Sequence, residues 1–205
     1  MTGAHIQHDE HYDTEANKMG MWVFLFTEFM LFGGLFLVYA VFRAKYSEDF
    51  HHAAIELNTF IGTLNTVVLL ISSMTVAMSI TALQKGNKLL SMALVSVTIL
   101  MALIFMLNKY FEWSHKFHYH IWPGSDVVKN MTHGETLFFG LYYFMTGLHA
   151  LHVIIGVILM SITITRIKSG HVTVARISLL ENSALYWHLV DLIWIFLFPL
   201  LYLIT

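Results

Sequence analysis

The sequence predicts an all-α fold, a polytopic membrane protein that forms a bundle of five transmembrane helices. Its 205 residues are 57% hydrophobic and only 12% charged, and the mean hydropathy is +0.67. No ordinary water-soluble domain needs such a composition. Five segments reach the roughly 20 apolar residues that cross a bilayer; they are residues 19–42, 58–83, 88–107, 136–164 and 183–204. The longest connection between them is 108–135.

Residues 1–18 differ from the rest of the chain, because they are polar and lack the basic start of a cleavable signal. We therefore expect a polar cytoplasmic tail (1–18) followed by the transmembrane bundle (19–205). Basic residues in short connections flank the spans on that same side, which favours a cytoplasmic N-terminus and an external C-terminus. These residues are Lys18, Lys85, Lys88, Arg166, Lys168 and Arg176.

The charge and the cysteine count exclude several classes of function. A net charge of -2 with scattered basic residues gives no surface for nucleic acid. The absence of cysteine excludes disulfides, thiolate-bound iron and sulfur, and cysteine-bridged copper. Any redox chemistry would have to use histidine.

Polar side chains interrupt three of the spans. The first carries Glu28, whose ionised form would cost about 2.5–3.5 kcal/mol near the bilayer centre, so a use for it is the default hypothesis. The fourth carries His149 and His152, and the fifth carries His188 and Asp191; each pair is three residues apart and so shares a helix face. With a rise of about 1.5 Å per residue, Glu28 and Asp191 should lie in one layer.

Simpler readings exist for these groups. The histidines can serve as interhelical hydrogen-bonding residues, and Glu28 can be a neutral carboxyl bonded to a neighbour. Two independent functions also stay open: a membrane cytochrome with haem between the fourth and fifth spans, and a proton-coupled transporter that uses Glu28 and Asp191. The glycines in the spans are expected to let helices approach closely; these are Gly33, Gly34, Gly140 and Gly147.

Four strings of residues carry a resemblance to a known family. They are Thr27-Glu28-Phe29-Met30-Leu31-Phe32, Leu64-Asn65-Thr66-Val67-Val68-Leu69-Leu70, Thr146-Gly147-Leu148-His149-Ala150-Leu151-His152-Val153-Ile154-Ile155-Gly156 and Tyr186-Trp187-His188-Leu189-Val190-Asp191-Leu192-Ile193-Trp194. In order and spacing the chain resembles subunit III of haem-copper terminal oxidases, from about Met19 to its C-terminus. It is most similar to the five-span bacterial form.

This resemblance implies an accessory, non-redox subunit of a respiratory proton pump in the bacterial inner membrane. The haems and copper would lie in partner subunits, with catalytic subunit I, subunit II and a small subunit IV as companions in the same complex and a respiratory supercomplex left open. A catalytic core needs about six intramembrane histidines, and only three are present here, so no cofactor, metal or catalytic residue is expected in this chain. The electron donor stays open between cytochrome c, which is slightly favoured, and quinol.

The resemblance also assigns two residues. In the family the glutamate at the position of Glu28 is the carboxyl that reacts with carbodiimides. The arginine at the position of Arg166 contacts a lipid phosphate, so bound phospholipid is expected.

Outside the spans, two histidine groups (His5, His8 and His11; His115, His118 and His120) lie on polar segments that are not expected to hold a metal. Glu112 and Trp113 are expected to anchor the interface or to pack on a partner subunit.

Overall fold

The computed structural model describes the backbone of residues 3–174 and 176–203, and the side chains in these ranges from Lys18 onward. The described chain forms α1 (Gly3–Lys45), α2 (Ser47–Ile55), α3 (Thr59–Gln84), α4 (Lys88–His118), α5 (Asp126–Lys129), α6 (His133–Lys168) and α7 (Ser178–Tyr202). In this part of the chain the β-type pairing is limited to one isolated bridge, between Thr173 and Arg176. The predicted all-α class is confirmed.

Five helices are long and apolar enough to cross a membrane, which confirms the predicted number of spans. They are Lys18–Lys45 within α1, and the whole of α3, α4, α6 and α7. The span of α1 continues without a break from the polar segment, because α1 begins at Gly3. The side chains of His5, His8 and His11 lie outside the described part of the structure.

The helix that contains the predicted third span extends past the predicted end at Leu107, because α4 continues to His118. The extension was missed because Lys109, Glu112 and Lys116 interrupt the apolar run. In the structure these three side chains are buried, with relative exposures of 3%, 6% and 5%. Charges that face the interior of a bundle do not end a helix, so the connection to α6 shortens and contains α5.

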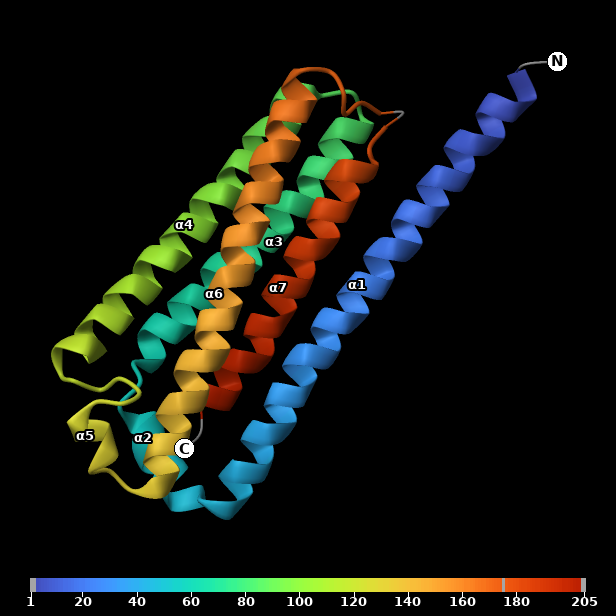
Figure 1. Cartoon of the computed structure of the whole chain (residues 1–205). Coiled ribbons are helices and arrows are strands. Elements are labelled where there is room, and N and C mark those ends of the chain that lie inside the picture. The colour runs from blue at the N-terminus through green and yellow to red at the C-terminus, as the bar shows by residue number, and fades with distance from the viewer. Residues whose placement is uncertain (1–2, 175, 204–205) are drawn as a thin grey trace.

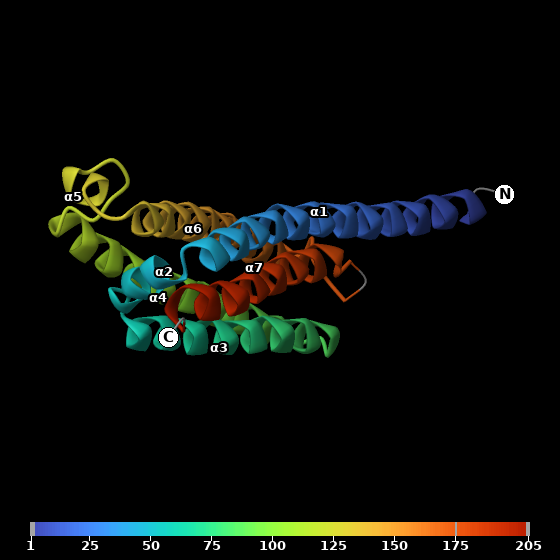
Figure 2. The ribbon, with the colours of Figure 1, turned by 90° about the horizontal axis from the view of Figure 1, so that it is seen from below.

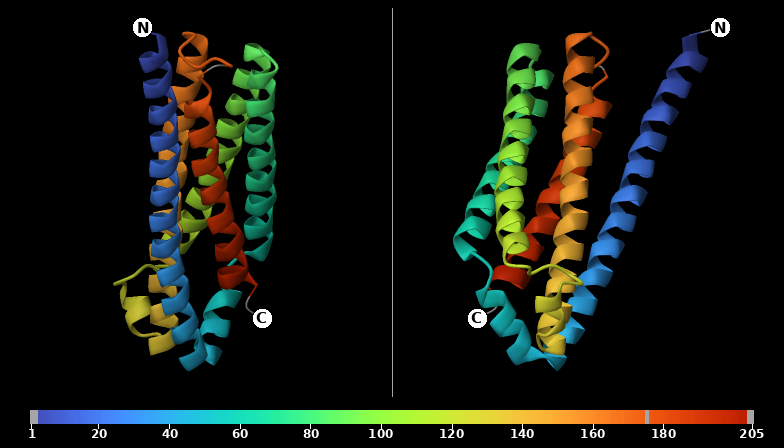
Figure 3. Two further views of the ribbon diagram at one scale, coloured as in Figure 1. Left: turned by 90° about the vertical axis from the view of Figure 1, so that its right-hand side faces the viewer. Right: turned by 60° about the vertical axis from the view of Figure 1, so that its left-hand side comes forward.

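Four of the spanning helices form a closed ring, and α1 lies outside it (Figure 1). In the ring, α3 contacts α4 and α7, and α6 contacts α4 and α7 in turn. Helix α1 packs against α6 and α7, and its N-terminal turns diverge from α7. The short helices α2 and α5 cover one end of the bundle (Figures 2 and 3). We call that end the Arg43 end and the opposite end the Lys18 end; α1, α4 and α7 run from the Lys18 end to the Arg43 end.

Local sequence signals fix where the helices begin. The side-chain oxygen of Asn58 accepts the backbone N–H groups of Phe60 and Ile61 at the start of α3, and Asn87 caps α4 through Leu90 N–H. These caps satisfy donors that a helix start leaves unpaired. The tight connection from α3 to α4 contains Gly86 with a φ of 79°, a left-handed conformation that glycine adopts without steric cost.

The interior of the ring combines large aromatic side chains with small hydroxyls. The Trp187 indole N–H donates to Ser72 Oγ at 3.0 Å, and Thr75 and Thr98 share a hydrogen bond of 2.8 Å between α3 and α4. Such contacts supply partners that the hydrocarbon core cannot provide. They join α3, α4 and α7 at one level.

The glycines that permit close helix contacts are not all those expected from sequence. A Cβ at Gly33, Gly34 or Gly140 would meet nothing within 4 Å, and one at Gly147 would lie 3.5 Å from Trp113. Tight approaches lie at other glycines, among them Gly62 and Gly134, and between α6 and α7 at Gly156, where a Cβ would lie 2.7 Å from two carbons of the Trp187 ring. Gly156 therefore sets the spacing between α6 and α7.

We predict that Gly156→Ala destabilises the protein by about 1–3 kcal/mol, because the added methyl overpacks against the Trp187 ring. The measurement is the midpoint of unfolding in mixed micelles. Gly140→Ala is the matched control, since it makes the same chemical change in α6 with open space around the new methyl. Equal midpoints for the two variants would contradict this account of the α6–α7 contact.

Candidate functional site

Glu28 and His152 form an ion-pair-type contact between α1 and α6. Glu28 Oε2 lies 2.9 Å from His152 Nε2, and the two side chains are 17% and 8% exposed. The other ring nitrogen of His152, Nδ1, lies 2.7 Å from the Leu148 carbonyl oxygen, one turn earlier in α6. Each nitrogen of the imidazole thus has a fixed partner.

These contacts are compatible with a single proton shared between Glu28 and His152. A carbonyl oxygen can only accept, so His152 Nδ1 must carry a hydrogen. Nε2 then either donates to an ionised Glu28 or accepts a hydrogen from a protonated Glu28. In both cases a single proton is shared between the two side chains and the pair is neutral, which is the state that a low-dielectric surrounding favours.

Aromatic side chains hold His152 in place. The Phe32 ring meets the imidazole edge-on at 5.3 Å, and the Tyr186 ring stacks on it at 6.4 Å. The Tyr186 hydroxyl also donates to the His152 carbonyl oxygen at 3.2 Å. Glu28 keeps a partly exposed carboxyl on a helix surface that is otherwise apolar, so a reagent dissolved in the bilayer can reach it.

His149 lies deeper in the ring than His152. It is fully buried, and neither of its ring nitrogens has a hydrogen-bond partner within the described residues. Its ring packs against Phe105 at 5.5 Å and Trp194 at 5.2 Å. The two histidines both face protein, but only His152 reaches the carboxyl on α1.

His188 and Asp191 meet at Ser73 of α3. His188 Nδ1 lies 2.7 Å from Ser73 Oγ, and the same hydroxyl lies beside Asp191. Asp191 is buried, and neither of its carboxyl oxygens has a hydrogen-bond partner within the described residues. Asp191 thus faces α3, whereas Glu28 faces α6.

Arg166 lies apart from these groups, exposed in the last turn of α6 at the Lys18 end. Its contact with a lipid phosphate stays a prediction.

A second buried cluster, which the sequence did not predict, centres on Lys109 and Glu112. Lys109 Nζ lies 3.2 Å from Glu112 Oε2 and donates to the Tyr202 hydroxyl at 2.8 Å and the Tyr142 hydroxyl at 3.3 Å. Both tyrosine hydroxyls donate to Glu112 Oε1, at 2.7 Å from Tyr142 and 2.6 Å from Tyr202. The cluster joins α4, α6 and α7 through charge-assisted hydrogen bonds.

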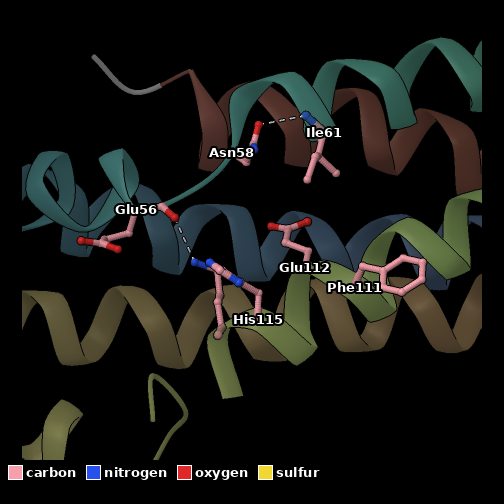
Figure 4. A pocket seen from close by; sticks show the side chains of 7 residues that line it. Glu56, Asn58, Ile61, Phe111, Glu112 and His115 are labelled. Atoms are coloured by element: carbon pink, nitrogen blue, oxygen red, sulfur yellow. Dashed lines mark hydrogen bonds between the residues drawn. The ribbon is translucent and has the colours of Figure 1, made fainter. Parts of the chain in front are cut away.

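A pocket of about 320 Å³ reaches this cluster from the Arg43 end (Figure 4). Glu112 lies at its inner side, with Glu56, Asn58 and His115 around it. Lys116 closes one wall and donates to the Glu56 carbonyl oxygen at 3.1 Å. The expectation that Glu112 anchors the membrane interface or packs on a partner is therefore wrong, because its carboxylate is bonded inside the chain.

The spacing of residues could have indicated this cluster. Lys109, Glu112 and Lys116 recur at intervals of three and four residues, which places them on one face of a continued helix. Their partners Tyr142 and Tyr202 come from distant helices and carry no local signal.

Within the described residues, no three side chains of histidine, cysteine, aspartate or glutamate gather as ligands for a metal ion. His115 and His118 instead contact the Tyr119 ring edge-on, at 4.9 and 5.7 Å.

The chain matches the family model described as Cytochrome c oxidase subunit III over residues 2–205. It belongs to the subunit III family of haem-copper oxidases. This membership confirms the resemblance seen in the sequence strings.

Similar proteins come from both branches of the family. Cytochrome c oxidase subunit 3 of Thermostichus vulcanus is 31% identical over 200 residues, which cover 95% of this chain and 90% of that protein. Probable quinol oxidase subunit 3 of Staphylococcus saprophyticus is 27% identical, covering 94% of this chain and 91% of that protein. Heme-copper oxidase subunit I+III of Aeropyrum pernix is 28% identical, covering 95% of this chain and 24% of that protein.

The four strings that resemble the subunit III family are brought together by the fold. Glu28 of the first string bonds His152 of the third, which contacts Tyr186 of the fourth. The Trp194 indole N–H of the fourth string donates to Thr66 Oγ of the second at 3.0 Å. In this chain, residues of the four strings thus hold the helices against one another.

We predict that Glu28→Gln abolishes most labelling of this chain by a hydrophobic carbodiimide, because the reagent needs a protonated carboxyl that it can reach from the bilayer. The measurement is the mass of the labelled chain. Asp191→Asn is the matched control and should leave labelling unchanged, since Asp191 is buried against α3. Persistent labelling of Glu28→Gln would place the reactive carboxyl elsewhere.

We also predict that Glu112→Gln lowers the free energy of unfolding by about 3–5 kcal/mol, because it leaves the buried Lys109 ammonium without its counter-charge. The double variant Lys109→Met with Glu112→Gln should lose less than the single variant. Lys129→Met, which breaks an exposed ion pair with Asp126, should change the value little. A double variant weaker than Glu112→Gln alone would show that the charge balance is not the cause.

Proposed function

We propose that this chain is the accessory, non-redox subunit III of a respiratory terminal oxidase of the cytochrome c type. It supports oxygen reduction coupled to proton pumping by stabilising the catalytic subunit, its proton uptake and its bound lipids. The observation that carries this proposal is the 2.9 Å contact between Glu28 and His152 in a chain that matches the subunit III family model over residues 2–205. The chain would lie in the bacterial inner membrane with its N-terminus in the cytoplasm.

The proposed partners are catalytic subunit I, subunit II and a small subunit IV. The Aeropyrum pernix relative supports the first of these, because its name joins subunits I and III in one polypeptide. A single chain of that kind keeps the two parts in one complex. The haems and copper would belong to the partners.

The Glu28–His152 pair supports a role beside the proton pathway of the catalytic subunit. It holds a proton inside the membrane without placing net charge there, at a helix surface that faces outward. A group of this kind can keep a local proton available while the obligatory transfer steps occur in subunit I.

The quinol oxidase branch is the alternative, and the Staphylococcus saprophyticus relative supports it. Its coverage of the chain is nearly the same as that of the cytochrome c oxidase relatives. The electron donor binds partner subunits in either case, so the residues described above serve both alternatives.

The geometry disfavours the independent membrane cytochrome. A haem between the fourth and fifth spans would need two histidines with free nitrogens that face each other across a gap. His149 instead packs on Phe105 and Trp194, both nitrogens of His152 are bonded, and His188 is bonded to α3. The proton-coupled transporter is also disfavoured. Many transporters bind their ions where a helix is unwound, whereas α1 and α7 are continuous at Glu28 and Asp191.

Phospholipid bound at the Lys18 end belongs to the same proposal. Arg166 is exposed in the last turn of α6, at the level where a phosphate would lie if the span of α6 matches the bilayer. A cation in the last turn of a helix is itself stabilised by the negative end of the helix dipole, so the guanidinium charge is well placed there.

Deleting the chain should slow steady-state turnover of the oxidase or shorten its active lifetime, without abolishing oxygen reduction. The measurement is oxygen consumption by the purified remainder, followed over many turnovers, with haem content as the assembly control. Glu28→Gln should leave haem content and assembly intact. Complete loss of haem oxidation in a fully assembled remainder would contradict an accessory role.

A further inference from the structure

A groove at the Arg43 end separates the last turns of α1 from the end of α7. It has a volume of about 670 Å³ and is distinct from the pocket at Glu112 and from Arg166, which lies at the opposite end of the bundle. Its lining is apolar except at one end, where Arg43 and Ser47 stand. The lining residues are Phe36, Leu37, Tyr39, Ala40, Arg43, Ala44, Ser47 and Leu200.

The floor of the groove is formed where α1 contacts α7. The buried Tyr39 hydroxyl donates to the Leu200 carbonyl oxygen at 2.6 Å, which ties α1 to α7. One turn earlier, the rings of Phe36 and Phe196 lie 6.1 Å apart. These contacts fix the separation of the two helices, so the groove is a property of the packed structure.

Arg43 stands at the level of a lipid phosphate. The span of α1 begins at Lys18, and 25 residues of helix at about 1.5 Å each separate it from Arg43, roughly 38 Å in all. A bilayer measures about 40–45 Å from headgroup to headgroup. With Lys18 in one headgroup layer, Arg43 lies in the other, and Leu37 and Ala40 lie among the acyl chains.

The charge of Arg43 has no counter-ion among the described residues, since no acidic side chain lies within ion-pair distance of it. The nearby Asp49 is turned to α6, where its Oδ2 accepts the Gly134 N–H at 3.2 Å. A guanidinium prefers planar, bidentate contact with phosphate oxygens. The combination of this cation with an apolar channel below it matches an anionic group that carries a hydrocarbon chain.

We propose that the groove is a specific site for an anionic phospholipid of the leaflet at the Arg43 end. The phosphate bonds to the Arg43 guanidinium and the Ser47 hydroxyl, and one acyl chain lies along Phe36, Leu37, Ala40 and Leu200. The lipid fills the space between α1 and α7 and so supports the packing of α1, the one span outside the ring.

The absence of cysteine from the chain allows a direct test. Val41→Cys, which is exposed beside the groove but does not line it, carries a fluorescent label in the assembled oxidase. The oxidase is reconstituted in vesicles of phosphatidylcholine and phosphatidylglycerol, with either lipid brominated on its acyl chains. Quenching by brominated phosphatidylglycerol should indicate roughly fivefold stronger association than quenching by brominated phosphatidylcholine, the effect expected for one interfacial cation.

Two charge variants on this background distinguish specific binding at Arg43 from nonspecific electrostatic attraction of anionic lipid. Arg43→Gln should remove the preference for phosphatidylglycerol, while Arg43→Lys should keep part of it. Lys45→Gln is the matched control, because it removes the same charge from the same helix turn but Lys45 lies over the Tyr46 ring and does not line the groove. Equal loss in Arg43→Gln and Lys45→Gln would overturn the proposal.

Two further outcomes would also overturn it. If inorganic phosphate at constant ionic strength relieves the quenching, the site binds a free anion and the acyl groove contributes nothing. If neither brominated lipid quenches the label, a protein surface covers the groove in the complex. Both outcomes are independent of whether the chain is an accessory subunit, because the lipid readout does not use turnover.

Discussion

The structure depends on one constraint: a polar group that the hydrocarbon core or the packed helices shield from water must find its hydrogen-bond partner within the protein. Glu28 finds His152 on another helix, and Lys109 finds Glu112 together with two tyrosines. Each of these contacts requires that at least two helices keep a fixed position relative to each other. The polar residues, which are the most costly to insert, are therefore the ones that define how the apolar helices are arranged.

The two buried charged groups solve this constraint differently. Glu28 and His152 sit between α1 and the ring, and the partly exposed carboxyl stays accessible from outside the bundle. Lys109 and Glu112 sit inside the ring and are almost fully covered. Their hydrogen bonds with Tyr142 and Tyr202 leave no charge without a partner, so this cluster is suited to holding three helices together. The Glu28–His152 pair is suited to reaction or proton exchange, and the Lys109–Glu112 cluster is suited to stabilising the fold.

Much of the fold followed from the sequence, since composition and run length are sufficient to predict membrane spans. The strings around Glu28, His152 and Tyr186 indicated the family, and the structure brings these residues into contact. The helical extension beyond Leu107 was not predicted, because its charged residues look like those of a loop unless their helical spacing is considered. The prediction also failed for the glycines, because close approach depends on what lies opposite. Gly156 faces the Trp187 ring, while Gly33 and Gly34 face open space, and no local pattern distinguishes them.

The position of the Glu28–His152 proton has a consequence for an energised membrane. A unit charge that crosses the whole bilayer gains about 2.3 kcal/mol per 100 mV. The heavy atoms that share this proton are 2.9 Å apart, about a tenth of the roughly 30 Å core even if they were aligned with the field. The membrane voltage can thus bias the choice between carboxyl and imidazole by only about 0.2 kcal/mol per 100 mV. The position of the proton within the pair is therefore nearly insensitive to the membrane voltage.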